Sequence, residues 1–474
     1  MQLDLQGSTL QYDKTWEHQQ ATQLASAEDF VGQLCSEFQK HNKIVADDYT
    51  PLDVKRGLRN ADGTGVMAGI TRIGNVLGYY MQDGVRQPME GRLIYRGIDV
   101  YDLIEGFTAE NRFGFEETAY LLLFGALPTR EQFDSFNSIL SSCRALPPGF
   151  TEDMILKAPS RNVMNKLARA ILALYSYDQD PENSSLEYQM CQALQLIARC
   201  PVVVAHAFAT KRHYFDNESL YLHRPQEGLS VAENFLYSVR HDNQYTPEEA
   251  HLLDLCLVLH MEHGGGNNSA FSCRVLSSSG TDIYSAVSAA VGSLKGPRHG
   301  GANAKVMEMM GYIERDVKDW KDDNEVSEYL AKIIRKETGD RSGLIYGMGH
   351  AIYTMSDPRA VLIKKFAKKV AAQKGMLDSF ELIESVERLT PSVFAKEKGD
   401  TKVMCANVDM YSGFVYRMMG IPEELYTPLF AIARMVGWCA HRIEEIYNPG
   451  NKIIRPAYKA IGDSQEFIPM DQRK

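Results

Sequence analysis

Apolar side chains recur at helical spacing over most of this 474-residue chain. In six segments they fall three and four residues apart, which gives each helix a continuous apolar face to bury. A chain patterned in this way folds as packed helices, so we expect helices to cover more than half of it. The six segments are residues 115–124, 163–175, 186–209, 247–261, 283–294 and 428–446.

One region, residues 65–97, departs from the helical pattern. Residues 70–80 and 91–96 contain alternating stretches of apolar and polar side chains, as half-buried strands do, and Asp83-Gly84 is typical of a tight hairpin turn. The sequence therefore predicts a mainly α protein with a short peripheral β element near its N-terminus.

The length predicts two domains, because single domains rarely grow far beyond about 200 residues. No Pro-rich or Ser-rich linker divides the chain into consecutive halves, so we expect the second domain to be an insertion. The prediction is a large helical domain formed by residues 1–300 and 421–474, and a small helical domain at residues 301–420, with the active site in the cleft.

The composition favours small molecules as partners. A formal charge of -10 and a pI near 5.7 argue against nucleic acid. Apolar runs such as residues 119–123 are far shorter than the roughly 20 residues that cross a bilayer, so we expect no membrane. The start of the chain lacks the features of a signal or transit peptide, which predicts a cytoplasmic protein. The eight cysteines form no Cys-x-x-Cys pair and are expected to be reduced core residues.

His263 lies where an apolar helix gives way to three glycines, residues 264–266, although a helix end needs only one. Together with His260 and Glu262 it suggests a metal site. The His-Glu-x-x-His arrangement of zinc enzymes is absent, however, and we expect no metal. A histidine that only ends a helix and a histidine that contacts a substrate both remain open.

His299 follows the helix predicted at residues 283–294 and the helix-ending pair Gly296-Pro297. The two glycines after it let another molecule approach the backbone closely. A catalytic histidine and an exposed loop histidine fit this position equally well.

His350 also lies beside glycines, at the end of residues 347–350, and a helix is predicted to begin near Pro358. Arg359 in its first turn opposes the helix dipole by about 0.3 to 1 kcal/mol, so we expect an anion beside it. That anion is either Asp357, in a surface salt bridge, or a carboxylate of a ligand.

Asp409 is a carboxylate in the otherwise apolar segment 403–413, where desolvation would make it a stronger base. The alternative is an N-cap for the helix that follows. On a later helix, Ala431 and Gly437 lie on the same face as Arg434 and leave room for an anion. The alternative is an arginine whose stem covers the core while its head reaches water.

These segments together indicate acid-base chemistry on a small polyanionic substrate. The sequence contains no Walker loop, dinucleotide-binding fingerprint or nucleophile elbow. That leaves proton abstraction next to a carbonyl as the favoured reaction type.

Five short motifs, in this order along the chain, resemble the citrate synthase family. The resemblance covers roughly residues 60 to 460. It implies a two-domain helical fold and the condensation of acetyl-CoA with oxaloacetate, as in the tricarboxylic acid cycle. The motifs are EHGGGN at 262–267, GPRHG at 296–300, GMGH at 347–350, DPR at 357–359 and NVD at 407–409.

The resemblance also implies a role for each catalytic residue. Asp409 would remove a proton from the methyl group of acetyl-CoA while His299 donates a hydrogen bond to the thioester oxygen. His350 would polarise the ketone of oxaloacetate and protonate it as the bond forms. The resulting citryl-CoA would be hydrolysed to citrate and CoA.

The same resemblance assigns the substrate contacts. His263, His350, Arg359 and Arg434 would bind oxaloacetate, together with Arg455 from the other subunit of a homodimer. No cofactor is expected, since acetyl-CoA is a substrate.

Three positions depart from the family pattern. Glu262 stands where Asp is commoner, Gly264 stands where many members have Glu, and Thr354 stands where many have a basic residue that meets the CoA phosphates. The CoA contacts expected here are Gly347, Met348 and Arg298.

Three other functions fit the same motifs. A 2-methylcitrate synthase would use propionyl-CoA, which differs by one methylene group and is worth only about 1 to 3 kcal/mol of discrimination. A citryl-CoA lyase-like enzyme would run in the cleavage direction. A non-catalytic homologue would bind oxaloacetate or CoA only, although both Asp409 and His299 are present.

Overall fold

The computed structural model describes residues 31–399, 403–450, 452–462 and 464–473. Two compact units emerge: residues 1–67 with 456–474, and residues 68–455. The second unit contains every predicted site residue. The domain boundaries expected at residues 300/301 and 420/421 remain a prediction.

The smaller unit contains short helical turns and exposed apolar side chains. Phe38 and Phe467 are both largely exposed. Its named elements are η1 (Ala46–Asp48), η2 (Thr50–Leu52), η3 (Arg56–Leu58) and η7 (Met470–Gln472).

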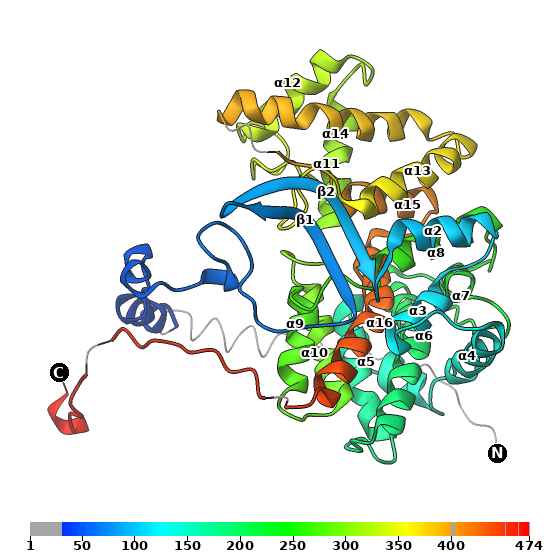
Figure 1. The fold of residues 1–474 in the computed structure, drawn as a ribbon, viewed down its shortest axis with the longest axis horizontal. Coiled ribbons are helices and arrows are strands. Elements are labelled where there is room, and N and C mark those ends of the chain that lie inside the picture. Colours follow the sequence, from blue (N-terminus) through cyan, green and yellow to red (C-terminus); the bar gives the residue numbers. More distant parts are fainter. Residues whose placement is uncertain (1–30, 400–402, 451, 463, 474) are drawn as a thin grey trace. The chain divides into compact units, whose positions relative to one another are not determined.

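A three-stranded antiparallel sheet opens the larger unit, in the order β1-β2-β3. Strands β1 (Gly74–Gln82) and β2 (Val85–Tyr95) form a long hairpin (Figure 1), and β3 is Ile98–Asp99. Asp83 and Gly84 form its turn with positive φ angles of 51° and 76°, as a two-residue hairpin loop requires. The predicted hairpin and its turn are confirmed.

Helices make up most of the protein, 59% against 6% strand, which confirms the expected mainly α class. All six predicted segments are helical. Helix α16 (Tyr426–Tyr447) lies at the centre of one group and contacts α3, α5, α6, α8, α9 and α10. The helices of this group are α2 (Val100–Ala109), α3 (Phe115–Phe124), α4 (Arg130–Cys143), α5 (Val163–Leu174), α6 (Leu186–Asp216), α7 (Val231–Val239), α8 (Pro247–His260), α9 (Asn268–Ser277) and α10 (Ile283–Lys295).

A second group of helices packs largely against itself and lies together in Figure 1. Its first helix begins after the glycines that follow His299, a loop before its third helix carries His350, and Asp409 lies in the first turn of its last helix. The members are α11 (Ala302–Asp316), α12 (Asp323–Ile334), α13 (Pro358–Gln373), α14 (Leu377–Lys398) and α15 (Val408–Met418).

Two details differ from the sequence-based expectations. Helix α6 is long and apolar enough to span a membrane, yet 78% of its most apolar window is buried inside the protein. It is therefore a core helix that packs on several neighbours. Five cysteines are buried as expected, but Cys35 and Cys191 are exposed and Cys143 is half-buried, because helical apolar stretches also have outer faces.

Candidate active site

Arg434 is fully buried in the middle of α16. Its Nε donates to the carbonyl oxygen of His260 at 2.7 Å, and its guanidinium lies 4.8 Å from the ring centre of Phe430. Neither Nη1 nor Nη2 has a hydrogen-bond partner among the residues that the structure describes. Burial lowers its pKa to about 10, so the group still carries its charge at neutral pH. The guanidinium of Arg434 therefore does not reach water, so that alternative is wrong. Its two Nη nitrogens remain available to bind an anion.

Gly437 serves a different purpose from the one expected. A Cβ there would lie 2.3 Å from the carbonyl oxygen of Met261 and 2.8 Å from Oε2 of Glu262. Its missing side chain therefore admits the segment that leads to His263, and not an anion.

Gly437→Ala should lower the free energy of unfolding by about 1 to 3 kcal/mol, because backbone atoms must shift to admit the methyl group. Denaturant unfolding of both proteins measures the difference. Gly292→Ala is the control: position 292 lies on α10 with no atom within 4 Å of the added Cβ, so helix propensity should leave stability equal or higher. Equal effects of the two substitutions would contradict this interpretation.

Arg359 lies in the first turn of α13 and is 3% exposed. Its Nε and Nη2 donate to the two carboxylate oxygens of Asp357 at 3.0 and 2.7 Å. Asp357 also caps α13 and accepts from the backbone N–H of Val408 at 3.2 Å. The pair predicted from the sequence exists, but it is a buried pair that joins two helix starts, and not a surface salt bridge.

His263, His350 and Tyr353 form one ring cluster. The ring centre of His263 lies 5.1 Å from that of His350 and 5.5 Å from that of Tyr353, and His350 stacks on Tyr353 at 4.7 Å. Burial lowers the pKa of His263 well below its usual value, helped by the positive charges of Arg359 and Arg434. His263 is therefore neutral. Its Nε2 has no hydrogen-bond partner among the described residues, which leaves it available to a ligand.

The backbone fixes the tautomer of His350. Its Nδ1 accepts hydrogen bonds from the N–H groups of Ile352 and Tyr353, each at 3.1 Å. A ring nitrogen that accepts cannot carry the proton, so the proton of the neutral ring is on Nε2. His350 therefore presents a neutral N–H donor.

His299 follows α10 and turns back into the protein. Gly300 makes the turn possible, because a Cβ there would lie 2.3 Å from the carbonyl oxygen of Leu294. The Nε2 of His299 lies 3.0 Å from the hydroxyl of Ser269, which also accepts from Nε1 of Trp438 at 3.1 Å. Burial lowers the pKa of His299 to about 4, and the charge of Arg434 adds to this. The alternative of an exposed loop histidine is therefore wrong.

Asp409 lies in the first turn of α15 and is half-buried. The N-cap is Asn407, whose side-chain oxygen accepts from the N–H of Asp409 at 3.0 Å, so the capping role considered for Asp409 is wrong. Desolvation raises the pKa of Asp409 to about 6, although Arg359 acts in the opposite direction. Asp409 is therefore a stronger base than an ordinary aspartate.

Two loops bring His350 and Asp409 together. Met348 and Ala406 form an isolated antiparallel bridge, and Asn407 Nδ2 donates to the carbonyl oxygen of Gly349 at 2.9 Å. Gly347 has a φ of 81°, and a Cβ there would lie about 3.1 Å from Met410 at the start of α15. The glycine therefore allows the loop before His350 to pack directly on the helix that carries Asp409.

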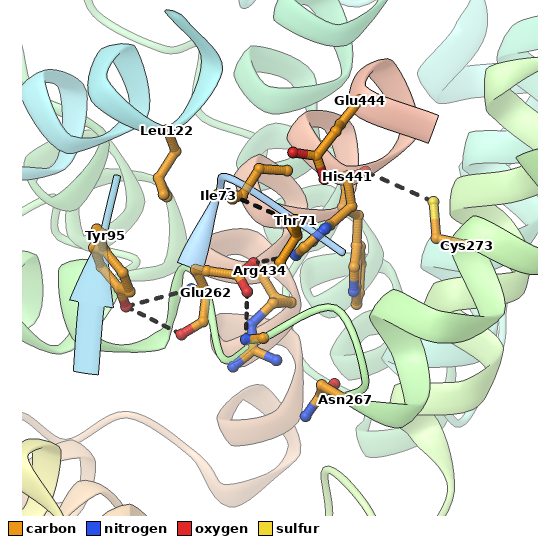
Figure 2. Close-up of polar contacts among 12 residues, drawn as sticks. Thr71, Ile73, Tyr95, Leu122, Glu262, Asn267, Cys273, Arg434, His441 and Glu444 are labelled. Atoms are coloured by element: carbon orange, nitrogen blue, oxygen red, sulfur yellow. Dashed lines mark hydrogen bonds and ion pairs between the residues drawn. The ribbon is translucent and has the colours of Figure 1, made fainter. Parts of the chain in front are cut away.

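Behind Arg434 lies a buried network of charged groups (Figure 2). The hydroxyl of Tyr95 donates to the backbone carbonyl oxygen of Glu262, and Nε2 of His441 lies 2.9 Å from the carboxylate oxygen Oε2 of Glu262. The other nitrogen of His441 accepts from Arg274 at 2.7 Å, so Nε2 carries the proton. The negative charge of Glu262 stabilises the Arg434 cation without forming a hydrogen bond to its Nη atoms.

Sequence reasoning missed the partners that position the site, namely Ser269, Trp438, Tyr353, Glu262 and His441. Trp438 and His441 lie one and two turns after Arg434 on α16, and that helical spacing was the available signal. Arg298 and Arg455 are both exposed, and neither joins the buried cluster. No group of three metal-ligating side chains occurs within the described ranges.

The site therefore combines two buried guanidiniums, three neutral histidines and a carboxylate of raised pKa. Such an arrangement can bind a small polyanion and move a proton beside a carbonyl.

Comparison with known proteins agrees with this class of enzyme. The family model described as citrate synthase, C-terminal domain, matches residues 62–457. A citrate synthase of Haloferax volcanii is 35% identical over 390 residues, covering 81% of this chain and 93% of the relative. A 2-methylcitrate synthase of Shewanella oneidensis is 32% identical over 382 residues, covering 80% and 92%.

Solved structures agree as well. The ternary complex of carboxymethyl coenzyme A and oxaloacetate with citrate synthase from Thermoplasma acidophilum matches with a TM-score of 0.70 and 25% identity, covering 89% of this chain and 99% of that one. Citrate synthase from Pyrobaculum aerophilum matches with a TM-score of 0.69 and 31% identity, covering 85% and 93%. The chain belongs to the citrate synthase family.

Proposed function

We propose that this enzyme condenses acetyl-CoA with oxaloacetate and hydrolyses the citryl-CoA product to citrate and CoA. One observation supports this most strongly: the unpartnered Nη atoms of Arg434 lie in the same buried cluster as neutral histidines and the raised-pKa carboxylate of Asp409. An anionic ketone fits the cations, and the carboxylate fits the removal of a weakly acidic proton.

Oxaloacetate binds first to the buried cations. Nη1 and Nη2 of Arg434 can hold one carboxylate in a two-point contact, and Arg359 supplies positive charge beside it. The unpartnered Nε2 of His263 gives a further contact. The Nε2–H of His350 then polarises the ketone, which makes its carbon a better electrophile, and protonates the oxygen as the new bond forms.

Enolisation of acetyl-CoA needs a base and a donor at the same time, because a thioester methyl group is a very weak acid. Asp409 removes the proton, and a neutral His299 stabilises the developing oxygen charge. Ser269 contacts Nε2 of His299 at 3.0 Å, accepts from Trp438 and donates to Oδ1 of Asn267, so its hydroxyl holds the His299 ring in place.

The acid side of the pH profile should report Asp409. Its pKa is about 6, so kcat/KM should fall as the pH drops through 6, where the carboxylate becomes protonated and stops accepting a proton. His299, with a pKa of about 4, stays neutral over this range. Initial rates between pH 5 and 8 measure the midpoint, and a kcat/KM that stays constant down to pH 5 would contradict the assignment, because an ordinary aspartate has a pKa of about 3.9.

The remaining contacts complete the proposal. Arg298, Gly347 and Met348 contact CoA, and Arg298 is exposed, as a phosphate contact requires. Arg455, also exposed, extends into the other active site of a homodimer. Acetyl-CoA is consumed as a substrate and no cofactor takes part.

We also propose that the enzyme acts in the cytoplasm, in the tricarboxylic acid cycle. The cysteines support a reducing compartment, since those the structure describes are all free thiols.

Propionyl-CoA is the second candidate substrate, because a 2-methylcitrate synthase is among the relatives. Release of CoA thiol should be measured with oxaloacetate and each acyl-CoA in turn, and the product identified by mass. A higher kcat/KM for acetyl-CoA supports the proposal, whereas a higher value for propionyl-CoA would make the enzyme a 2-methylcitrate synthase. Cleavage of citryl-CoA to acetyl-CoA without net hydrolysis would instead indicate a lyase.

A further inference from the structure

The β1–β2 hairpin packs backbone to backbone on the loop that carries His350. A Cβ at Gly78 would lie 2.5 Å from the Cα of Tyr353, and a Cβ at Gly91 would lie 2.1 Å from the carbonyl oxygen of Ser356. Only glycine permits such close approach on both strands. The hairpin and the loop therefore fit together without intervening side chains at these two points.

Polar contacts lock this interface at three places. The hydroxyl of Thr354 donates to the carbonyl oxygen of Gly78 on β1 and accepts from the N–H of Met89 on β2 at 3.1 Å. Arg86 donates through Nη2 to the carbonyl oxygen of Ile352 at 3.1 Å. The N–H of Gly91 donates to the hydroxyl of Ser356 at 3.0 Å. Thr354 is the one side chain among these that bonds to both strands of the hairpin.

The residues just before Thr354 in the same loop contact the His350 ring. The N–H groups of Ile352 and Tyr353 donate to Nδ1 of His350, and the Tyr353 ring stacks on the imidazole at 4.7 Å. Thr354 follows directly after these two residues. A shift of the segment away from the hairpin would therefore move both hydrogen bonds that set the tautomer and orientation of His350.

We propose that Thr354 is a positioning residue for His350, and that the β1–β2 hairpin is the rigid element to which Thr354 attaches the His350 loop. This inference rests on the proposed condensation of acetyl-CoA with oxaloacetate. The departure at position 354 thereby acquires a role: in place of a basic side chain, the hydroxyl ties the His350 loop to the hairpin.

Thr354→Val keeps the shape of the side chain and removes the hydroxyl, whereas Thr354→Ser keeps the hydroxyl. We expect kcat to fall about tenfold in the valine variant, the effect of misplacing one hydrogen-bonding group, and to stay within about twofold of wild type in the serine variant. KM for acetyl-CoA should change little. In the valine variant, ¹³C NMR of bound oxaloacetate should show a smaller downfield shift of the ketone carbon, because His350 polarises it less.

A second pair of variants keeps the test decisive if the valine protein folds poorly. Arg86→Met removes the bond to Ile352 and should also lower kcat and the ketone shift. Arg92→Met on the same hairpin removes a pair with Asp99 and should change neither. Wild-type kcat and an unchanged ketone shift in Thr354→Val or Arg86→Met would overturn the positioning role. Wild-type protein that neither binds oxaloacetate nor releases CoA would instead refute the proposed function itself.

Discussion

Replacing Asp409 with Asn is expected to lower kcat by about a thousandfold, within the range that a general base contributes. The substitution preserves the size of the side chain and its position after the Asn407 cap, but an amide cannot accept the methyl proton. Release of CoA thiol with saturating oxaloacetate measures the loss. Binding of oxaloacetate should be unchanged, because the contacts proposed for the carboxylates of that substrate are with the arginines and histidines and not with Asp409.

Asp378→Asn is the matched control, since Asp378 also lies in the first turn of a helix but is paired with Lys321 at the surface. Its kcat should equal that of wild type. Full turnover by Asp409→Asn would show that another group removes the proton. The fall of kcat/KM near pH 6 would then have to be assigned to that group.

Replacing Arg434 with Met should weaken oxaloacetate binding at least about a hundredfold, because a fully desolvated charge contact to a carboxylate is lost. The free energy of unfolding without substrate should fall less than in the control Arg442→Met, since Arg434 donates one hydrogen bond, to the carbonyl oxygen of His260, while two of its nitrogens are unsatisfied. Calorimetric titration with oxaloacetate and denaturant unfolding measure the two quantities. A large loss of affinity with a small loss of stability distinguishes a binding role from a structural one.

Arg442→Met gives the opposite expectation. Arg442 lies on the same helix and is buried, but its guanidinium donates to Gln189, Ser277 and Thr281. Its removal should lower the free energy of unfolding, because buried acceptors lose their donors, and should leave oxaloacetate affinity unchanged. Identical behaviour of the two variants would mean that Arg434 is a structural arginine.

Local patterns predicted much of the fold. Apolar spacing located the six long helices, and α3 has the same bounds as its predicted segment, because burial of one helix face leaves a periodic trace in the sequence. The Asp83-Gly84 turn was likewise predicted from adjacent residues alone. Helix α6 was predicted over residues 186–209 and extends to Asp216; packing buries it from several sides, so this core helix has the composition of a membrane span.

The residues of the candidate site could be predicted from the sequence, but their arrangement in space could not. His299 alone was compatible with an exposed loop, and its burial depends on Ser269 and Trp438, which are 30 and 139 positions away. Asp357 was recognised as a partner for Arg359, yet its second contact, to Val408, lies 51 positions along the chain. Such pairings arise only when helices from distant parts of the chain pack, and no local spacing encodes them.

The same active site is proposed to perform both enolisation of acetyl-CoA and condensation with oxaloacetate. The most direct test is to incubate wild-type protein with acetyl-CoA labelled with ¹³C at the methyl carbon, add oxaloacetate, and follow the label by NMR. We expect the label to appear in a methylene group of citrate, with one CoA thiol released for each citrate formed. Label that stays in acetyl-CoA, in a folded protein that binds oxaloacetate, would contradict the claim.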